Sequence, residues 1–83
     1  MKKFDVIVIE DVEVQGVGYY QKSTDGMSIE ADSSSITDFF SDVIRSKKII
    51  GNMEFKGGGS HSLFSGNYLV EKVNGNQIKL RKA

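Results

Sequence analysis

One helical stripe stands in a sequence that otherwise has the patterns of strands, and it limits the folds open to the chain. Its apolar residues recur at helical spacing over more than two turns: Ile36, Phe39, Phe40, Val43 and Ile44. Side chains at these intervals share one face of an α-helix. Two phenylalanines in one stripe indicate tight packing against an apolar surface. We therefore expect this helix to pack against a β-sheet.

The sequence also indicates where the helix begins and ends. Ser35 is followed three residues later by Asp38, which approximates a capping box at the first turn. Arg45, Lys47 and Lys48 fall in the expected last turn, where positive charge favours the negative end of the helix dipole. The helix is predicted between these two groups.

Three strands are predicted before the helix. Residues 4–10 are rich in β-branched side chains and apolar at both parities, which indicates a strand covered on both faces. A second strand, residues 12–21, is interrupted by Gly16 and Gly18, and such glycines often mark a bulge or bend. After a turn at residues 23–26, residues 27–32 alternate apolar and polar side chains, as half-buried strands do.

Three further strands are predicted after the helix. Residues 49–56 alternate apolar and polar side chains. Residues 56–66 contain Gly-Gly-Gly-Ser and resemble a flexible linker by composition, so they are predicted to form a loop. Two strands, residues 68–73 and 77–82, then flank Asn74-Gly75, which is a strong hairpin signal.

These elements predict the order βββαβββ in a single domain of residues 1–83. The fold class is mainly β with one helix (α+β), as a small helix-flanked β-barrel or sandwich. The order fits an OB-like barrel, in which a helix lies between the third and fourth strands. It fits other helix-flanked sandwiches equally well. A chain of this size buries about 60–65% of the surface that its unfolded form exposes, so we expect modest stability.

The composition excludes several kinds of chemistry. There is no cysteine, and hence no disulfide framework, thiolate nucleophile or sulfur-ligated metal site. His61 is the single histidine and falls in the predicted loop, so it is interpreted as a solvated residue. Asp11 and Glu13, close to Glu10, are the carboxylates best spaced for weak binding of a hard cation, but an acidic strand edge is the simpler interpretation. No catalytic residue, cofactor, metal site or small-molecule substrate is predicted.

A net charge of zero conceals an uneven distribution along the chain. Residues 1–44 contain three lysines and nine carboxylates, a net charge of −6, whereas residues 45–83 contain eight basic residues and two carboxylates, a net charge of +6. Such asymmetry can mark a nucleic-acid surface or a head-to-tail contact between identical subunits. It also arises when strands from the two halves interleave and their charges mix on a solvated surface.

No apolar segment reaches the roughly 20 residues needed to cross a bilayer. Asp5 and Glu10 interrupt the apolar run after the basic start before it could serve as a cleavable signal. The protein is therefore expected to be soluble, to have no membrane partner, and to be cytoplasmic or virion-associated.

One stretch resembles a known catalytic loop. Val-Gln-Gly-Val-Gly-Tyr-Tyr, residues 14–20, is similar to the V-Q-G-V-G-[FY]-R loop of acylphosphatases, and residues 25–30 loosely resemble the family's later D-G-x-V-E segment. In that family backbone amides cradle a phosphate and an arginine clamps it. Here Tyr20 occupies the place of the arginine, and the space between the two segments is too short for the family's first helix and catalytic asparagine. The stretch is interpreted as a strand bent at Gly16 and Gly18, and the protein as non-enzymatic.

A second resemblance covers residues 64–80. Their sequence is similar to the F-S-G-x-Y-x-V-x-x-V…L-x-L hairpin of tube-like domains in phage tail tube and baseplate hub proteins. Those domains are β-barrels or sandwiches with a flanking helix, assembled side by side into rings, although this chain is shorter than a usual tube subunit. The resemblance implies a self-assembling, homo-oligomeric tail or virion subunit. The residues expected at its interface are Tyr19, Tyr20, Phe64, Lys79 and Arg81.

Two alternative functions remain open. Binding of single-stranded nucleic acid requires cations along a groove and exposed aromatic rings. The residues that would provide them are Lys56, Tyr68, Lys72, Lys79, Arg81 and Lys82. Phe55 falls on the apolar parity of its strand and is assigned to the core. A small phage-type inhibitor that acts by binding another protein would have a similar sequence.

Overall fold

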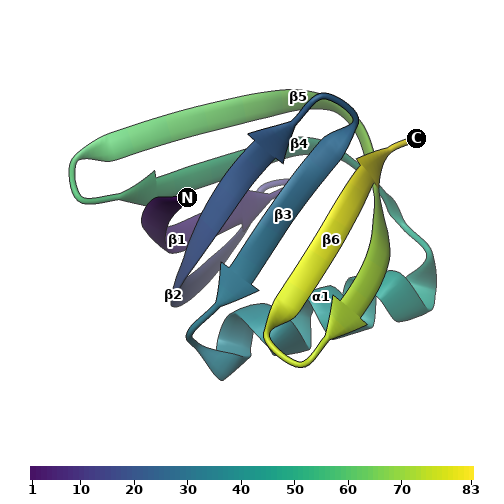
Figure 1. The fold of residues 1–83 in the computed structure, drawn as a ribbon, viewed down its shortest axis with the longest axis horizontal. Coiled ribbons are helices and arrows are strands. Elements are labelled where there is room, and N and C mark those ends of the chain that lie inside the picture. Colours follow the sequence, from purple (N-terminus) through teal and green to yellow (C-terminus); the bar gives the residue numbers. More distant parts are fainter.

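The computed structural model describes residues 1–83 and contains six antiparallel strands that close into a barrel, with one helix (Figure 1). The elements are β1 (Lys2–Ile9), β2 (Val12–Ser23), β3 (Gly26–Ala31), α1 (Ser34–Ser46), β4 (Ile49–Gly57), β5 (Ser60–Asn74) and β6 (Gln77–Lys82). The predicted fold class and the order βββαβββ are confirmed.

The barrel consists of two three-stranded meanders, β1–β2–β3 and β4–β5–β6, which α1 connects. It closes where β1 pairs with β4 and β3 pairs with β6. The OB fold has five strands, so this six-stranded barrel is related to the OB-like prediction only in outline. One end of the barrel holds α1 with the β1–β2 and β5–β6 turns, and we call it the helix end. The opposite end holds the β2–β3 and β4–β5 turns.

A single core of 17 buried apolar residues fills the barrel, and no polar or charged residue is buried. The predicted helical stripe contributes Ile36, Phe40 and Val43 to this core, while Phe39 and Ile44 are half-buried against it. Helix α1 therefore closes one end of the barrel (Figure 1).

The start of α1 differs from the prediction. The N-cap residue is Ser33, and no side chain caps the helix, so the capping box expected at Ser35 is absent. The Ser33 hydroxyl accepts a hydrogen bond from the Val17 N–H at 2.9 Å, and the Ser35 hydroxyl donates one to the Gln15 carbonyl at 2.6 Å. Both serines therefore attach the helix to β2, because a free strand edge competes with the helix for their hydroxyl groups.

The end of α1 comes slightly earlier than the basic residues suggested. Lys47 is the C-cap, in the left-handed conformation with φ of 55°, and its N–H donates to the Ile44 carbonyl. Only Arg45 lies in the last turn, and Lys48 lies beyond the helix.

The irregularity predicted for the second strand is present. The β1–β2 register shifts between Phe4 and Val6, opposite the step from Gly18 to Gln15. Because of this shift, Phe4 and Ile7 both face the core. They are three residues apart, and a regular strand would place them on opposite faces. The prediction that β1 is covered on both faces is wrong, because Val6, which lies on the outer face, is only half-buried.

The two glycines of the acylphosphatase-like stretch allow close packing. A Cβ on Gly16 would lie 2.6 Å from the Ser35 hydroxyl oxygen, and one on Gly18 would lie 2.7 Å from both the Glu30 carbonyl oxygen and the Phe4 ring. Neither glycine has a positive φ. This stretch is a continuous part of β2, packed against α1, β3 and a core side chain.

The predicted loop over residues 56–66 is wrong. These residues belong to a β4–β5 hairpin with a two-residue turn, Gly58–Gly59, whose φ angles are 56° and 81°. Glycine adopts these angles at no steric cost, which is why a Gly-Gly turn suits a hairpin. Gly57 lies in β4, where a Cβ would meet the Phe4 and Asp5 backbone at 2.9 Å.

The β5–β6 hairpin is confirmed, with its turn one residue later than predicted. Asn74 pairs with Gln77, and the turn residues are Gly75 and Asn76, with φ of 60° at Gly75. The Asn76 carbonyl accepts a hydrogen bond from the Ala31 N–H at 2.8 Å, which ties this turn to the end of β3.

Candidate interaction surfaces

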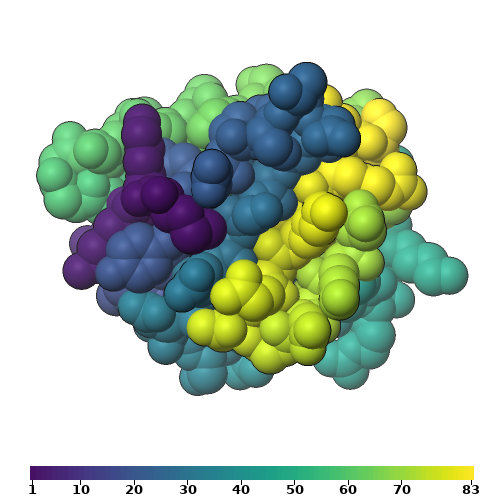
Figure 2. Space-filling view, viewed as in Figure 1, coloured from purple at the N-terminus to yellow at the C-terminus, as the bar shows by residue number.

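Four of the predicted nucleic-acid residues gather over β5 and β6. Lys79 lies opposite Ser28 on one side and Lys72 on the other. Arg81 and Lys82 line a hollow of about 540 Å³ together with Lys79. We call Lys72, Lys79, Arg81 and Lys82 the basic face. It lies where the last strand (yellow) runs beside the β2–β3 hairpin (blue) in Figure 2.

The basic face contains some opposite charge. Glu71 and Asp25 line the same hollow, and the Glu71 carboxylate lies 3.9 Å from Arg81 Nε. Both partners in this ion pair are about half exposed, so it contributes little to stability. The face is therefore a polar depression with a surplus of cations.

The other two predicted nucleic-acid residues lie elsewhere. Tyr68 pairs with Ile50 on the inward side of β5 and is only 1% exposed, so its assignment to a surface was wrong. Lys56 lies on the outside of β4, with its Nζ 3.8 Å from Glu54. Strand β5 separates β4 from β6, which keeps Lys56 apart from the basic face.

The assignment of Tyr20 to an interface was also wrong. Its ring is 5% exposed and stacks on Phe55 with 4.1 Å between ring centroids. Its hydroxyl donates to Ser62 Oγ at 2.7 Å, which satisfies the one polar atom of this core side chain. Phe64, a second predicted interface residue, is half-buried and packs edge-on against Tyr20 and Phe55. In place of the phosphate clamp of acylphosphatases, the chain has a core aromatic residue.

Tyr19 lies on the outside of the barrel and is half-buried. Its neighbours across β1 and β3 are Lys3 and Glu30. No other aromatic side chain lies on the outer surface of β2, β3 or β6. The basic face therefore has a single aromatic ring near it.

The two ends of the barrel carry opposite charge. Adjacent antiparallel strands bring their ends together, so the position of each charged residue along its strand assigns it to an end. Carboxylates in the helix-end half are Glu10, Asp11, Glu13, Glu30, Asp32, Asp38 and Asp42, and the basic residues there are Arg45, Lys47, Lys48, Lys72 and Lys79, which gives a net charge of −2. Basic residues in the opposite half are Lys2, Lys3, Lys22, Lys56, Arg81 and Lys82, and the carboxylates there are Asp5, Asp25, Glu54 and Glu71, which gives a net charge of +2. The separation of charge along the sequence thus becomes, with some exchange, a separation along the barrel.

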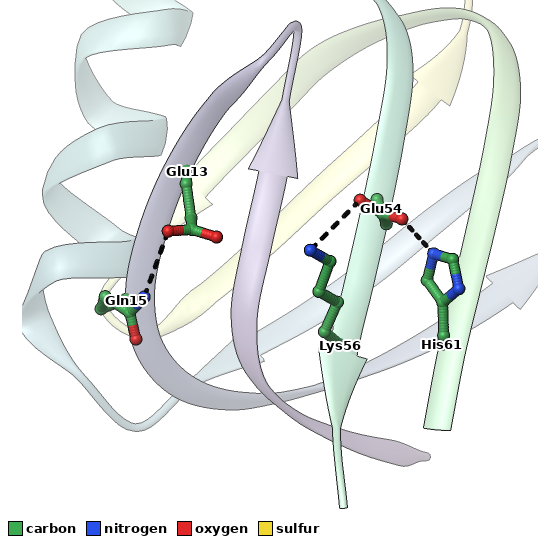
Figure 3. A network of polar contacts seen from close by, with 5 residues as sticks. All are labelled: Glu13, Gln15, Glu54, Lys56 and His61. Atoms are coloured by element: carbon green, nitrogen blue, oxygen red, sulfur yellow. Dashed lines mark hydrogen bonds and ion pairs between the residues drawn. The ribbon is translucent and has the colours of Figure 1, made fainter. Parts of the chain in front are cut away.

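Two separate groups of polar contacts lie on the outside of the barrel, one within β2 and one between β4 and β5 (Figure 3). Glu54 contacts Lys56 Nζ with one oxygen and His61 Nε2 with the other, and Gln15 donates to Glu13 at 3.4 Å. His61 therefore lies on a strand and not in a loop, but its side chain is exposed to solvent, as interpreted. No three metal-binding side chains come together anywhere in the chain.

The β1–β2 turn is strained. Its two residues, Glu10 and Asp11, are not glycines and have φ of 49° and 68°. The Glu10 carboxylate accepts hydrogen bonds from the N–H groups of Gly51 and Asn52, the latter at 2.9 Å. These bonds hold Glu10 against β4, so the carboxylates at residues 10–13 do not converge on a common cation.

A shallow apolar groove of about 370 Å³ lies between this turn and α1. Val12 and Ile49 line it and are 53% and 57% exposed, and Phe39 contributes its half-buried ring. Asp42 and Lys48 also line it, so its rim carries both signs of charge.

Helix α1, with 13 residues, is too short to cross a membrane, and no other helix is present. No protein-family model, curated protein or solved structure matches this chain. A proposal for its function therefore depends on the surfaces described above.

Proposed function

We propose that the protein is a non-enzymatic structural module that associates with copies of itself, as a tail-type or virion subunit. The observation that carries this proposal is the opposite charge of the two barrel ends. When one copy places its helix end against the opposite end of the next, Asp38 and its neighbours meet Lys22, Lys82 and theirs.

A contact between two different surfaces of the same chain is heterologous. Such contacts produce rings when the rotation closes and filaments when it does not. Complementary charge steers the subunits together and disfavours the reversed orientation, in which like charges meet. The resemblance of residues 64–80 to tail-tube hairpins supports the same kind of assembly.

The strength of this contact is limited by solvent exposure. An exposed ion pair contributes about 0–1 kcal/mol, and salt screens it within a Debye length of about 8 Å at physiological ionic strength. Several such pairs act together across a barrel end, so we expect weak association that strengthens at low salt.

Size-exclusion chromatography with light scattering tests the proposal at ionic strengths of ~0.01 M and ~1 M, where the Debye length falls from about 30 Å to about 3 Å. The expected result, at one fixed protein concentration, is a mass above 9.2 kDa at low salt that falls at high salt. A strict monomer at low salt and high protein concentration would contradict it.

Charge-reversal variants test which surfaces meet. Lys22→Glu with Lys82→Glu makes both ends acidic, and Glu13→Lys with Asp38→Lys makes both ends basic. Each variant alone should lose the low-salt association, and a mixture of the two should recover it. Lys22→Arg with Lys82→Arg preserves the charges and serves as the control. Unchanged association of either charge-reversed variant would exclude the end-to-end contact.

Single-stranded nucleic-acid binding is the second candidate, because Lys72, Lys79, Arg81 and Lys82 gather on one face. Four phosphate contacts would give a slope of log affinity against log salt of about −3. The test is fluorescence anisotropy of a labelled oligonucleotide at ~50 mM salt. An absence of binding there would remove this candidate. An inhibitor of another protein, the third candidate, would instead form a mixed complex with that protein.

A further inference from the structure

Strand β5 has an unpaired edge, although the barrel is closed. Residues 60–69 of β5 pair with β4, but pairing with β6 begins only at Tyr68. On the side away from β4, residues 60–67 therefore have no partner strand. The tip of this hairpin projects from the body of the molecule at the left of Figures 1 and 2.

A similar edge exists on β2, where that strand extends beyond β3, but there the chain itself covers it. The edge of β5 at residues 60–67 is left open. Where β2 extends beyond β3, the Val17 carbonyl accepts hydrogen bonds from the N–H groups of Asp32 and Ser33, just before α1. Along the unpaired edge of β5, residues 60–67, the Asn67 carbonyl alone accepts a backbone hydrogen bond, from the Ala83 N–H at 2.8 Å. The residues before it have no covering element.

The hairpin turn determines which backbone groups face outward. A two-residue turn makes Gly57 and Ser60 the first pair, and backbone groups alternate between the two edges along an antiparallel strand. Accordingly, His61, Leu63 and Ser65 turn their N–H and C=O groups away from β4. All three residues are exposed, and Leu63 is 61% exposed.

This edge lacks the usual protection. Natural proteins shield exposed edges with lysine, other charges, proline or a bulge that twists the edge away. Residues 60–67, Ser-His-Ser-Leu-Phe-Ser-Gly-Asn, contain no lysine, arginine, carboxylate or proline. The register shift in β5 occurs opposite the step from Ile50 to Asn52, at the far end of this segment. Between residues 60 and 65 the edge is regular and uncharged.

We propose that this edge pairs antiparallel with the same edge of a second copy, about a two-fold axis at Leu63. The outward groups of His61, Leu63 and Ser65 are symmetric about Leu63, so each N–H meets a C=O of the other copy. His61 lies opposite Ser65, and the two Leu63 side chains cover each other. No like charges face one another, and this self-complementarity identifies a second copy as the partner.

The pairing differs in kind from the end-to-end contact, and it does not depend on that proposal. Three outward-facing residues per copy bury less than the roughly 1,200 Å² of a stable interface, so the pair should be transient and favoured at high protein concentration. Because it contains no ion pair, salt should change it little.

The decisive experiment measures mass by light scattering at ~1 M salt, where charge contacts are screened. The wild-type protein should show a concentration-dependent dimer. Leu63→Lys should abolish it, because pairing would strip water from two ammonium groups placed opposite each other, a cost that salt does not remove, whereas Leu63→Thr, neutral and compatible with a strand, should retain it. Because Leu63 is largely exposed, both variants should keep the wild-type circular dichroism spectrum.

A mixed pair tests the register. In the Lys22→Glu, Lys82→Glu background, which removes the end-to-end contact, Leu63→Lys mixed with Leu63→Glu should form a heterodimer at low salt while each alone stays monomeric, because only a two-fold axis at Leu63 places these side chains together. A wild-type monomer at ~1 M salt and high concentration, or a Leu63→Lys dimer, would overturn the proposal. Either result leaves the salt-sensitive end-to-end contact to be judged by its own charge-reversal variants.

Amide hydrogen exchange provides an independent measurement. The amides of His61, Leu63 and Ser65 should exchange more slowly as protein concentration rises, and those of Ser62 and Phe64, which face β4, should not change. If the exchange rates of the His61, Leu63 and Ser65 amides do not change with protein concentration, pairing at this edge is excluded.

Discussion

Glycine is needed at positions 16 and 18 because other parts of the molecule pack directly against the backbone there. Gly16 lies against the start of α1, and Gly18 lies between the Glu30 backbone and the Phe4 ring. In a phosphate-binding loop such glycines would leave amides free for a ligand. Here they let β2 approach α1 and the core, so a similar sequence serves a different physical purpose.

Replacing Gly16 by alanine should therefore destabilise the fold. The added Cβ would lie 2.6 Å from Ser35 Oγ, and overpacking of this kind costs about 1–3 kcal/mol of unfolding free energy. Urea denaturation measures the change, with Ser34→Ala on the exposed first turn as the control. In a Ser35→Ala background the cost should be smaller. A neutral Gly16→Ala would contradict the packing argument.

Asp11 is a position where a mutation should stabilise the protein. Its φ of 68° costs a residue with a Cβ about 1–2 kcal/mol relative to glycine. Asp11→Gly should raise the unfolding free energy by about 1 kcal/mol. Glu10→Gly relieves the same strain but also removes the hydrogen bonds to Gly51 and Asn52, so it should be less favourable. Thermal melting of the two variants, compared directly, checks this order.

At the scale of elements, the Tyr20 hydroxyl links β2 to the β4–β5 hairpin through Ser62. Tyr20→Phe removes this bond and should cost about 1 kcal/mol, as should Ser62→Ala. Because the two side chains are hydrogen-bond partners, the double variant should cost less than the sum of the single variants. Additive losses in a denaturation cycle would show that the bond contributes nothing.

The sequence predicts elements well where periodicity decides them. The stripe in α1 and the alternation in β3 are determined locally, and both are present in the structure. The β4–β5 hairpin escaped prediction because its composition is that of a linker. Tertiary contacts make it a hairpin: β4 pairs with β1, and Phe64 packs against Tyr20 and Phe55. The helix start was misplaced for a similar reason, since β2 takes the hydroxyl groups.

The candidate surfaces were predicted only in part. Charged residues of the last hairpin, such as Lys79 and Arg81, follow strand alternation and do lie together. Tyr20 and Tyr68 were misassigned because alternation does not say which parity faces inward. The unpaired β5 edge could not be foreseen, because it results from β5 continuing past β6.

At the scale of the whole molecule, one continuous core joins both meanders and α1. Unfolding should therefore be a single cooperative transition, as it is for most small domains. Circular dichroism in the far ultraviolet and tyrosine fluorescence should give the same urea midpoint. Separate midpoints would indicate that one meander unfolds independently of the other.

The closed barrel also has a consequence for the order of folding. Each meander forms from neighbouring segments, but the pairings of β1 with β4 and of β3 with β6 join residues far apart in the chain. Contacts of large sequence separation slow folding, because a long stretch must be ordered before they form. Until β6 has been synthesised, β3 has no second neighbour. A ribosome-bound chain thus carries an open sheet, and closure is its last event.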